Sequence, residues 1–277
     1  MRTVTLPGGG KVPALGQGTW YMGDNAARRA EEIASLQTGV DLGMTLIDTA
    51  EMYGNGRSEE LVGEAIAGRR DKVFLVSKVL PSNASRQGTK KACERSLKRM
   101  RTEVIDLYLL HWQGSYPFED TIAGMMELKQ EGKIRHWGVS NMDVDEMQEI
   151  FAIRKGDTCA VNQILYNLSR RGVEYDLLPW SKERSLPVMA YSPIEQARIL
   201  KDRTLATVAK AHNATSAQVA LAWVLRNPGI IAIPKAGLVA HVRENAASID
   251  LALTPDDLVA LDAAFRAPTR KMSLEML

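Results

Sequence analysis

Eight short apolar or β-branched runs alternate along the chain with segments that have the periodicity of α-helices. The runs are too short and too apolar to be half-exposed hairpin strands, and they suit a parallel sheet buried on both faces. Their positions are residues 15–17, 45–47, 73–76, 104–110, 134–139, 160–161, 188–190 and 230–233. Over 277 residues, this alternation predicts an α/β fold, a (β/α)8 TIM barrel.

The segments between these runs carry the signals of amphipathic helices. Ile33, Leu36 and Val40 recur at helical spacing and would share one buried face. Gly132 follows the fourth helical segment, where a left-handed residue commonly ends a helix. Thr254 is followed by proline and two aspartates, which predicts a capped helix start.

The N-terminal segment is expected to stand apart from the barrel sheet. Residues 3–13 place Pro-Gly-Gly-Gly between two β-prone stretches, which predicts a β-hairpin that plugs the bottom of the barrel. A doubly wound sheet is the alternative fold, but no strand–G-x-G-x-x-G–helix unit is present, since residues 16–21 lack the third glycine. No linker divides the chain, so residues 1–277 are expected to form a single domain.

Composition restricts the classes of partner. The net charge is +2 with acids and bases interspersed, which gives no reason to expect nucleic acid or a membrane surface. No run approaches the roughly 20 apolar residues of a membrane span, and the first ten residues lack a secretory apolar core. Cys93 and Cys159 fit buried thiols better than a disulfide or a zinc site. We expect a cytoplasmic monomer without a metal.

Polar or aromatic side chains stand at or just beyond the end of every predicted strand. In a TIM barrel these ends converge on one face, where such enzymes place their active sites. Polar loops alone would favour Gly, Ser and Asp turns, and not an acid, a lysine and a histidine beside apolar strands. The residues at the strand ends are Thr19 and Trp20, Asp48, Lys78, His111, Ser140 and Asn141, Gln163, Tyr191 and Ser192, and Lys235.

Three of these groups, together with Tyr53 in the loop after the second strand, can assist the reduction of a carbonyl. Asp48 and Lys78 on nearby strand ends would pair, because an unpaired charge there is unfavourable. The ammonium would lower the pKa of Tyr53 from about 10 and make it a usable proton donor. His111 could hydrogen-bond the carbonyl oxygen and orient it. Hydride must come from a nicotinamide or a flavin. A structural Asp–Lys pair with an unrelated tyrosine and histidine is the competing interpretation.

At these residues the sequence resembles the aldo-keto reductase superfamily, over nearly the whole chain. Five segments carry the resemblance in the family's order and at family-like spacings. They are GMTLIDTAEMYGN at 43–55 with the LVG of 61–63, VSKV at 76–79, DLYLLHW at 106–112, GKIRHWGVSN at 132–141 and IPK at 233–235. The resemblance implies an oxidoreductase similar to bacterial aldehyde and methylglyoxal reductases.

The resemblance also assigns roles to residues. It implies a catalytic tetrad of Asp48, Tyr53, Lys78 and His111, with Tyr53 as the general acid, and NAD(P)H extended across the barrel mouth. Its cofactor positions are Ser140, Asn141 and Gln163 for the carboxamide, Tyr191 for ring stacking, Ser192, Ile194 and Gln196 for the pyrophosphate, Lys235 for the 2′-phosphate, and Glu244 and Asn245 for adenine, with Thr19, Trp20, Asp48, Ile233 and His241 completing the set.

The adenosine end departs from the commoner family pattern. His241 stands where an arginine is usual, and a neutral histidine offers one weak donor in place of a two-pronged fork. Arg243 would compensate if its helix turned it inward. We therefore expect NADPH to be preferred, less strongly than in members that keep the arginine, with NADH as a weaker alternative.

The substrate side is expected to be open. Trp20, Tyr53, His111 and Trp112 would form the substrate pocket, with Tyr21 beside them. The loop after Trp112 and the C-terminal tail are short, which suggests a permissive site for small aldehydes such as methylglyoxal or aromatic aldehydes.

Other polar residues receive structural interpretations. His136 and His212 are expected to be solvated or structural, and Arg170 and Arg171 to lie in a solvated loop.

Two other functions remain open. A nicotinamide-binding regulatory or accessory subunit with vestigial catalysis could use the same barrel, although it would not need Tyr53 and His111 together. An unrelated barrel lyase or isomerase would need metal carboxylates or a Schiff-base lysine, whereas Lys78 beside Asp48 should stay protonated.

Overall fold

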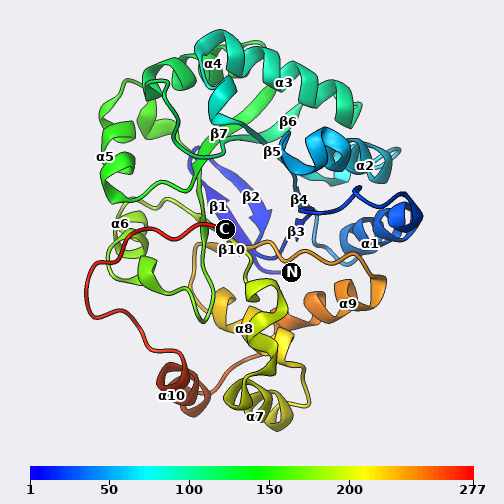
Figure 1. The fold of residues 1–277 in the computed structure, drawn as a ribbon, viewed down its shortest axis with the longest axis vertical. Helices are drawn as coiled ribbons and strands as arrows, with labels where there is room; N and C mark the ends of the chain where they lie inside the picture. Colours follow the sequence, from blue (N-terminus) through cyan, green and yellow to red (C-terminus); the bar gives the residue numbers. More distant parts are fainter.

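The computed structural model describes residues 1–277, and its strands form a hairpin and an eight-stranded barrel (Figure 1). Bridges from Leu15 to Ala232 and from Gly18 to Lys235 join the first and last barrel strands, so the parallel sheet closes on itself. The hairpin pairs β1 (Thr3–Leu6) with β2 (Gly10–Pro13). The barrel follows chain order as β3 (Gln17–Gly18), β4 (Leu46–Asp48), β5 (Phe74–Val79), β6 (Ile105–Leu110), β7 (Ile134–Ser140), β8 (Asn162–Leu165), β9 (Val188–Tyr191) and β10 (Ile230–Ala232).

A ring of helices surrounds the barrel, and each strand is followed by at least one of them (Figure 1). Their apolar faces are buried against the sheet, as Leu36 and Val40 of the first helix illustrate. The helices are α1 (Arg29–Asp41), α2 (Arg57–Ala65), α3 (Arg86–Met100), α4 (Phe118–Gln130), α5 (Val144–Ala152), α6 (Leu177–Glu183), α7 (Arg203–Ala211), α8 (Ser216–Leu225), α9 (Val239–Ala247) and α10 (Pro255–Ala264). None combines the length and apolar character needed to cross a bilayer.

The predicted (β/α)8 barrel with its N-terminal hairpin is confirmed, and the doubly wound alternative is wrong. The helix signals also correspond to observed ends. Gly132, with φ +73°, follows the end of α4, and Thr254 caps α10 with a reciprocal hydrogen bond to Asp257.

β8 begins two residues beyond its predicted start, as β3 also does. We expected residues 160–161, but β8 begins at Asn162 and continues through Gln163. Both polar side chains are fully buried, because Asn162 bonds the backbone of Met142 and Gln163 bonds a carboxylate of the site. The apolar run at residues 160–161 therefore precedes this strand and is not part of it.

The two ends of the barrel are covered by different segments. Gly10 of the hairpin lies near His136 at the start of β7, so the hairpin closes the amino-terminal ends of the strands as predicted. The tail after α10 returns across the opposite end and finishes near the barrel axis (Figure 1). Only the carboxyl-terminal mouth is therefore left for a site, and the tail partly covers it.

Candidate active site

Two cavities meet at the carboxyl-terminal mouth of the barrel. The long cavity, about 400 Å³, runs from Asp48 and Tyr53 to Lys235 and the start of α9. The short cavity, about 250 Å³, is lined by His111, Trp112, the ends of β7 and β8, and the C-terminal tail. Trp20, Tyr53 and Tyr191 line both. The side chains between the cavities can therefore touch a ligand in either.

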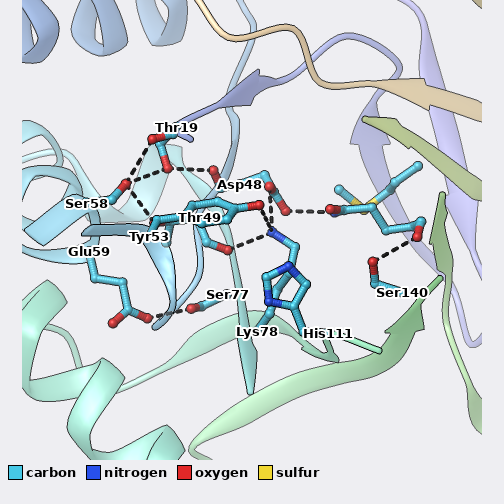
Figure 2. A network of polar contacts seen from close by, with 12 residues as sticks. Thr19, Asp48, Thr49, Tyr53, Ser58, Glu59, Ser77, Lys78, His111 and Ser140 are labelled. Carbon is cyan, nitrogen blue, oxygen red and sulfur yellow. Dashed lines mark hydrogen bonds and ion pairs between the residues drawn. The ribbon is translucent and has the colours of Figure 1, made fainter. Parts of the chain in front are cut away.

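Asp48 and Lys78 are buried and form a cluster with the half-buried Tyr53 at these cavities (Figure 2). Lys78 Nζ donates to Asp48 Oδ2 at 2.7 Å, to the Thr49 carbonyl at 2.9 Å and to the Tyr53 hydroxyl at 3.2 Å. An ammonium has three N–H bonds, so all of them are used. The predicted Asp48–Lys78 pair is present, and it is wholly removed from solvent.

Neighbouring strands and the start of α2 hold this cluster in position. Ser58 donates to Thr19 Oγ1 at 2.8 Å, and Thr19 Oγ1 in turn donates to the Asp48 carbonyl at 2.9 Å. Glu59, fully buried, accepts from Ser77 and from Arg99, both at 2.5 Å, and so ties α2 to β5 (Figure 2). Ser58 and Glu59 follow Tyr53 closely in the sequence, so the segment after the reacting tyrosine serves to hold the strands of the site together.

The turn between Tyr53 and α2 requires left-handed backbone. Gly54, Asn55 and Gly56 all have positive φ, from +53° to +91°. A Cβ on Gly56 would lie 2.5 Å from Arg99 Cδ, so this position excludes a side chain on two grounds. The turn places Tyr53 over Lys78, whose Nζ is 4.8 Å from the centre of the phenol ring.

The prediction that the pKa of Tyr53 is lowered is wrong for the protein without a ligand. Burial raises the pKa of Tyr53, and this effect exceeds the lowering by Lys78. The negative charge of Asp48 also raises it and opposes the influence of the ammonium. Tyr53 therefore holds its proton at neutral pH, which is the state a proton donor requires.

His111 faces the same cluster from the end of β6. Its ring packs edge-on to Tyr53 with 5.9 Å between centroids, and it is 8% exposed. Burial, assisted by the charge of Lys78, lowers its pKa to about 2. Nδ1 is buried without a hydrogen-bond partner. His111 is thus a neutral imidazole throughout the physiological range and not a second acid.

The residues expected to hold the carboxamide of the cofactor form one hydrogen-bonded set. Ser140 donates to the Gln163 carbonyl at 2.9 Å, and Asn141 Nδ2 donates to the His111 carbonyl at 3.1 Å. The Tyr191 hydroxyl donates to Asn141 Oδ1 at 2.9 Å. Asn141 sits at φ +59°, a conformation that asparagine tolerates well. The set links the ends of β6, β7, β8 and β9 around the short cavity.

The far end of the long cavity carries the residues expected to meet adenosine. Lys235, His241, Glu244 and Asn245 all line it. Arg243 is exposed and does not line it, so the expected compensation by an inward-turned Arg243 is wrong. The reason is the phase of α9, on which residues 241, 244 and 245 share the cavity face.

A strained loop covers the middle of the long cavity. Ser192, Gln196 and Ala197 line it, and all three have positive φ, as does Glu195 between them. Glu195 is buried and is held by Asn167 Nδ2 at 2.8 Å and by Arg170 at 3.0 Å. These contacts hold a backbone conformation that isolated residues avoid.

Arg170 and Arg171 do not lie in a solvated loop as expected. Arg170 pairs with Glu195 and, at 2.5 Å, with Glu275 of the tail. Arg171 is 7% exposed and pairs with Glu174 at 2.8 Å. Glu174 is local to Arg171, but both partners of Arg170 are distant, at 25 and 105 residues along the chain, so local sequence gave no sign of them.

The tail narrows the site that we expected to be open. Lys271 pairs with Asp143 at 2.6 Å and with Asp176 at 2.7 Å, and Glu275 pairs with Arg170. Beyond these anchors, Met276 and Leu277 line the short cavity. The tail is short, but its ion pairs direct it over the mouth.

Nearly every residue predicted for the site lies in it. Lys78 alone lines neither cavity, because it is buried below Tyr53. Several further residues line the cavities, at positions that depend on loop paths and were not predicted from the sequence. They are Gly18, Met52, Pro193, Ala197, Leu200, Ala217, Met276 and Leu277. The two other histidines lie elsewhere. His212 bonds Asp257 at 2.7 Å, and His136 packs near Phe74.

Sequence comparisons agree with this geometry. A model of the Aldo/keto reductase family matches residues 14–266. Methylglyoxal reductase YeaE of Escherichia coli (strain K12) is 51% identical over 100% of this chain and 99% of its own length. Glyoxal reductase of Bacillus subtilis (strain 168) is 33% identical over 94% of this chain and 92% of its own.

Solved structures give the same result. An aldo-keto reductase from Klebsiella pneumoniae in complex with NADPH superposes with a TM-score of 0.98 at 49% identity, covering 100% of this chain and 99% of that one. The thermostable aldo-keto reductase Tm1743, in complex with the inhibitor epalrestat, superposes with a TM-score of 0.90 at 38% identity, covering 95% of this chain and 99% of that one.

Proposed function

This chain belongs to the Aldo/keto reductase family, and we propose that it is an NADPH-dependent reductase that converts small aldehydes and ketones to alcohols. The observation that carries the proposal is the position of Tyr53. Its protonated hydroxyl is bonded to Lys78, and its side chain lines both cavities. A hydride donor in one cavity and a carbonyl in the other would meet beside it.

The residues present fit a nicotinamide dinucleotide. The two cavities together lead from an amide-rich region at Asn141 and Gln163 in the short cavity, past Tyr191, which lines both, to Lys235 and Asn245 at the far end of the long cavity. Ser140, Asn141 and Gln163 supply the donors and acceptors that would hold a carboxamide, and Tyr191 offers a flat ring surface for stacking. When bound, the reduced nicotinamide supplies the hydride.

Side chains of the protein carry out the proton transfer. Tyr53 donates its proton to the carbonyl oxygen as negative charge develops there. Lys78, hydrogen-bonded to Tyr53 and held by Asp48, stabilises the phenolate that remains. Neutral His111 would orient the carbonyl as a hydrogen-bond donor without competing as an acid, since its pKa is about 2.

The short cavity favours a small carbonyl substrate. Its volume of about 250 Å³ is below the range of roughly 300–1,000 Å³ typical of drug-sized ligands. Trp20, Trp112 and Met276 make its walls largely apolar. The relatives named methylglyoxal reductase and glyoxal reductase support methylglyoxal as substrate, and aromatic aldehydes are the largest carbonyls we expect.

We further propose one domain spanning residues 1–277, acting as a monomer in the cytoplasm. Cys93 and Cys159 are free and buried, which suits a reducing compartment.

The test is the oxidation of NADPH by methylglyoxal, followed by loss of reduced-cofactor absorbance. We expect Tyr53→Phe to lower kcat by about 100-fold or more while cofactor still binds. Tyr175→Phe, at an exposed tyrosine that lines neither cavity, is the matched control and should keep full activity.

Two outcomes would contradict the proposal. NADPH binding without turnover of any aldehyde would favour the accessory-subunit alternative. Turnover that survives Tyr53→Phe would remove Tyr53 as the proton donor.

A further inference from the structure

A second cation stands beside Lys235 at the far end of the long cavity. Lys235 Nζ lies 3.6 Å from the point where a Cβ on Gly237 would be, and Arg28 Nη2 lies 3.0 Å from the same point. Arg28 directly precedes α1, which packs against α9 (Figure 1). Arg28 is 207 positions from Lys235 in the chain, so no local pattern relates the two residues.

Neither cation has a close anionic partner. Lys235 forms no ion pair, and the single ion pair of Arg28 joins its Nε to Glu31 at a loose 3.8 Å. The nearest buried carboxylate, Glu32, is already engaged by the Gly23 amide at 2.9 Å. Partial burial lowers the pKa of Lys235, as does the charge of Arg28, and the charge of Glu32 opposes them. Two neighbouring positive charges, neither of them in a close ion pair, favour a bound anion.

Gly237 makes this juxtaposition possible. It is buried, and a Cβ at 3.0 Å from Arg28 Nη2 would press on the guanidinium. Among the residues of the helix that follows, only His241 offers a basic side chain to the cavity, and it is a single donor without fixed charge. The fixed positive charge that an arginine at position 241 would supply is instead present on Arg28, just before α1.

We propose that Arg28 acts with Lys235 to bind the 2′-phosphate of NADPH and so sets the preference for NADPH over NADH. The inference rests on the proposed function, because it assumes a dinucleotide in the long cavity. Lys235 contributes a compact charge, and Arg28 contributes a planar fork that can hold two phosphate oxygens. Arg28 is a specificity-determining residue and takes no part in hydride or proton transfer.

The experiment measures binding by calorimetry, without turnover, using 2′,5′-ADP and 5′-AMP as probes. These differ only in the 2′-phosphate. We expect Arg28→Gln to weaken 2′,5′-ADP by about 10- to 100-fold, as expected when a hydrogen bond to a charged group is lost, and to leave 5′-AMP unchanged. Arg28→Lys should restore part of the loss.

Arg29→Gln is the matched control. Arg29 is the next residue, but its guanidinium is bonded to Glu64 at 2.9 and 3.0 Å, so both probes should bind as they do to the unmodified chain. Equal weakening of both probes by Arg28→Gln, or a change of less than twofold, would overturn the inference.

The same titration separates the two proposals. If the unmodified chain binds neither 2′,5′-ADP nor NADPH, the proposed function fails and the role of Arg28 fails with it. If the unmodified chain and Arg28→Gln bind 2′,5′-ADP equally well, only the role of Arg28 is lost.

Discussion

Gln163 Nε2 donates to Asp48 Oδ1 at 2.8 Å, on the side of the carboxylate opposite the one that Lys78 occupies. The two residues are 115 positions apart, and their bond spans the barrel from β4 to β8. Both oxygens of Asp48 are therefore fixed, and the carboxylate cannot turn away from Lys78. The Gln163 amide, which would face the cofactor, therefore also orients the Asp48 carboxylate of the catalytic cluster.

Removing the charge of Asp48 should damage both stability and catalysis. Asp48→Asn leaves Lys78 without its anion at a site with 0% exposure, and we expect a loss of about 3–5 kcal/mol in the free energy of unfolding. Urea unfolding measures this loss, and NADPH oxidation measures the fall in kcat.

The double variant Asp48→Asn with Lys78→Met tests the cause. Because it removes both charges, its loss of stability should be smaller than the sum of the two single losses, while activity stays absent. Additive losses would mean that the pair contributes nothing as a pair.

The buried neutral His111 should make stability fall with acid. Below its ordinary pKa of 6.5 the unfolded chain binds a proton at this residue, whereas the folded chain does not until about pH 2. The unfolded state is therefore favoured as pH decreases, by roughly 1.4 kcal/mol for each pH unit below 6.5. Urea unfolding at about pH 7, 6 and 5 measures how steeply the free energy of unfolding falls with pH.

His111→Gln provides the reference for this measurement. His136, whose pKa is also lowered, contributes to both proteins alike, so the difference between their slopes isolates His111. Identical slopes would show that His111 takes up a proton in the folded chain near its ordinary pKa.

Shortening Met276 should broaden the range of substrates. Met276 lines the short cavity, so Met276→Ala should raise kcat/KM for an aromatic aldehyde relative to methylglyoxal by about 10-fold. Met272→Ala, at an exposed tail position outside that cavity, should leave the ratio unchanged. An unchanged ratio for Met276→Ala would mean that the tail does not bound the substrate.

Arg170 should control two segments at once. Arg170→Met removes the ion pairs to Glu195 in the strained loop and to Glu275 in the tail, so limited proteolysis should cut both segments faster. Cofactor affinity should fall by about 10-fold through the loss of a charged contact under the loop.

Glu275→Gln separates the two effects. It weakens only the tail contact, so the tail alone should become sensitive to protease while cofactor affinity is kept. Loss of cofactor affinity in this variant would contradict independent anchoring of the loop.

The sequence predicted the barrel and most of the site because both depend on local signals. Apolar runs locate strands, and residues at or just beyond the ends of several runs line the mouth, as Asp48 and His111 do. The predictions that failed depend on distant partners. The pKa of Tyr53 follows from burial, and the pairing of Arg170 with Glu275 follows from the path of the tail.

β8 shows a different limit. Its polar residues Asn162 and Gln163 are buried because they bond Met142 and Asp48, groups that only the closed barrel brings near. The position of Arg28 beside Lys235 was hidden in the same way, since it depends on how α1 packs against α9.

The three hydrogen bonds of Lys78 restrict how this chain could diverge in evolution. Asp48 and Lys78 hold strands together, whereas Tyr53 adds a single hydrogen bond at 3.2 Å and His111 forms no ion pair. A descendant that abandoned catalysis could lose Tyr53 or His111 early, but it would keep the buried pair to remain folded. A surviving Asp–Lys pair would then be a relic of chemistry in a protein that no longer performs it.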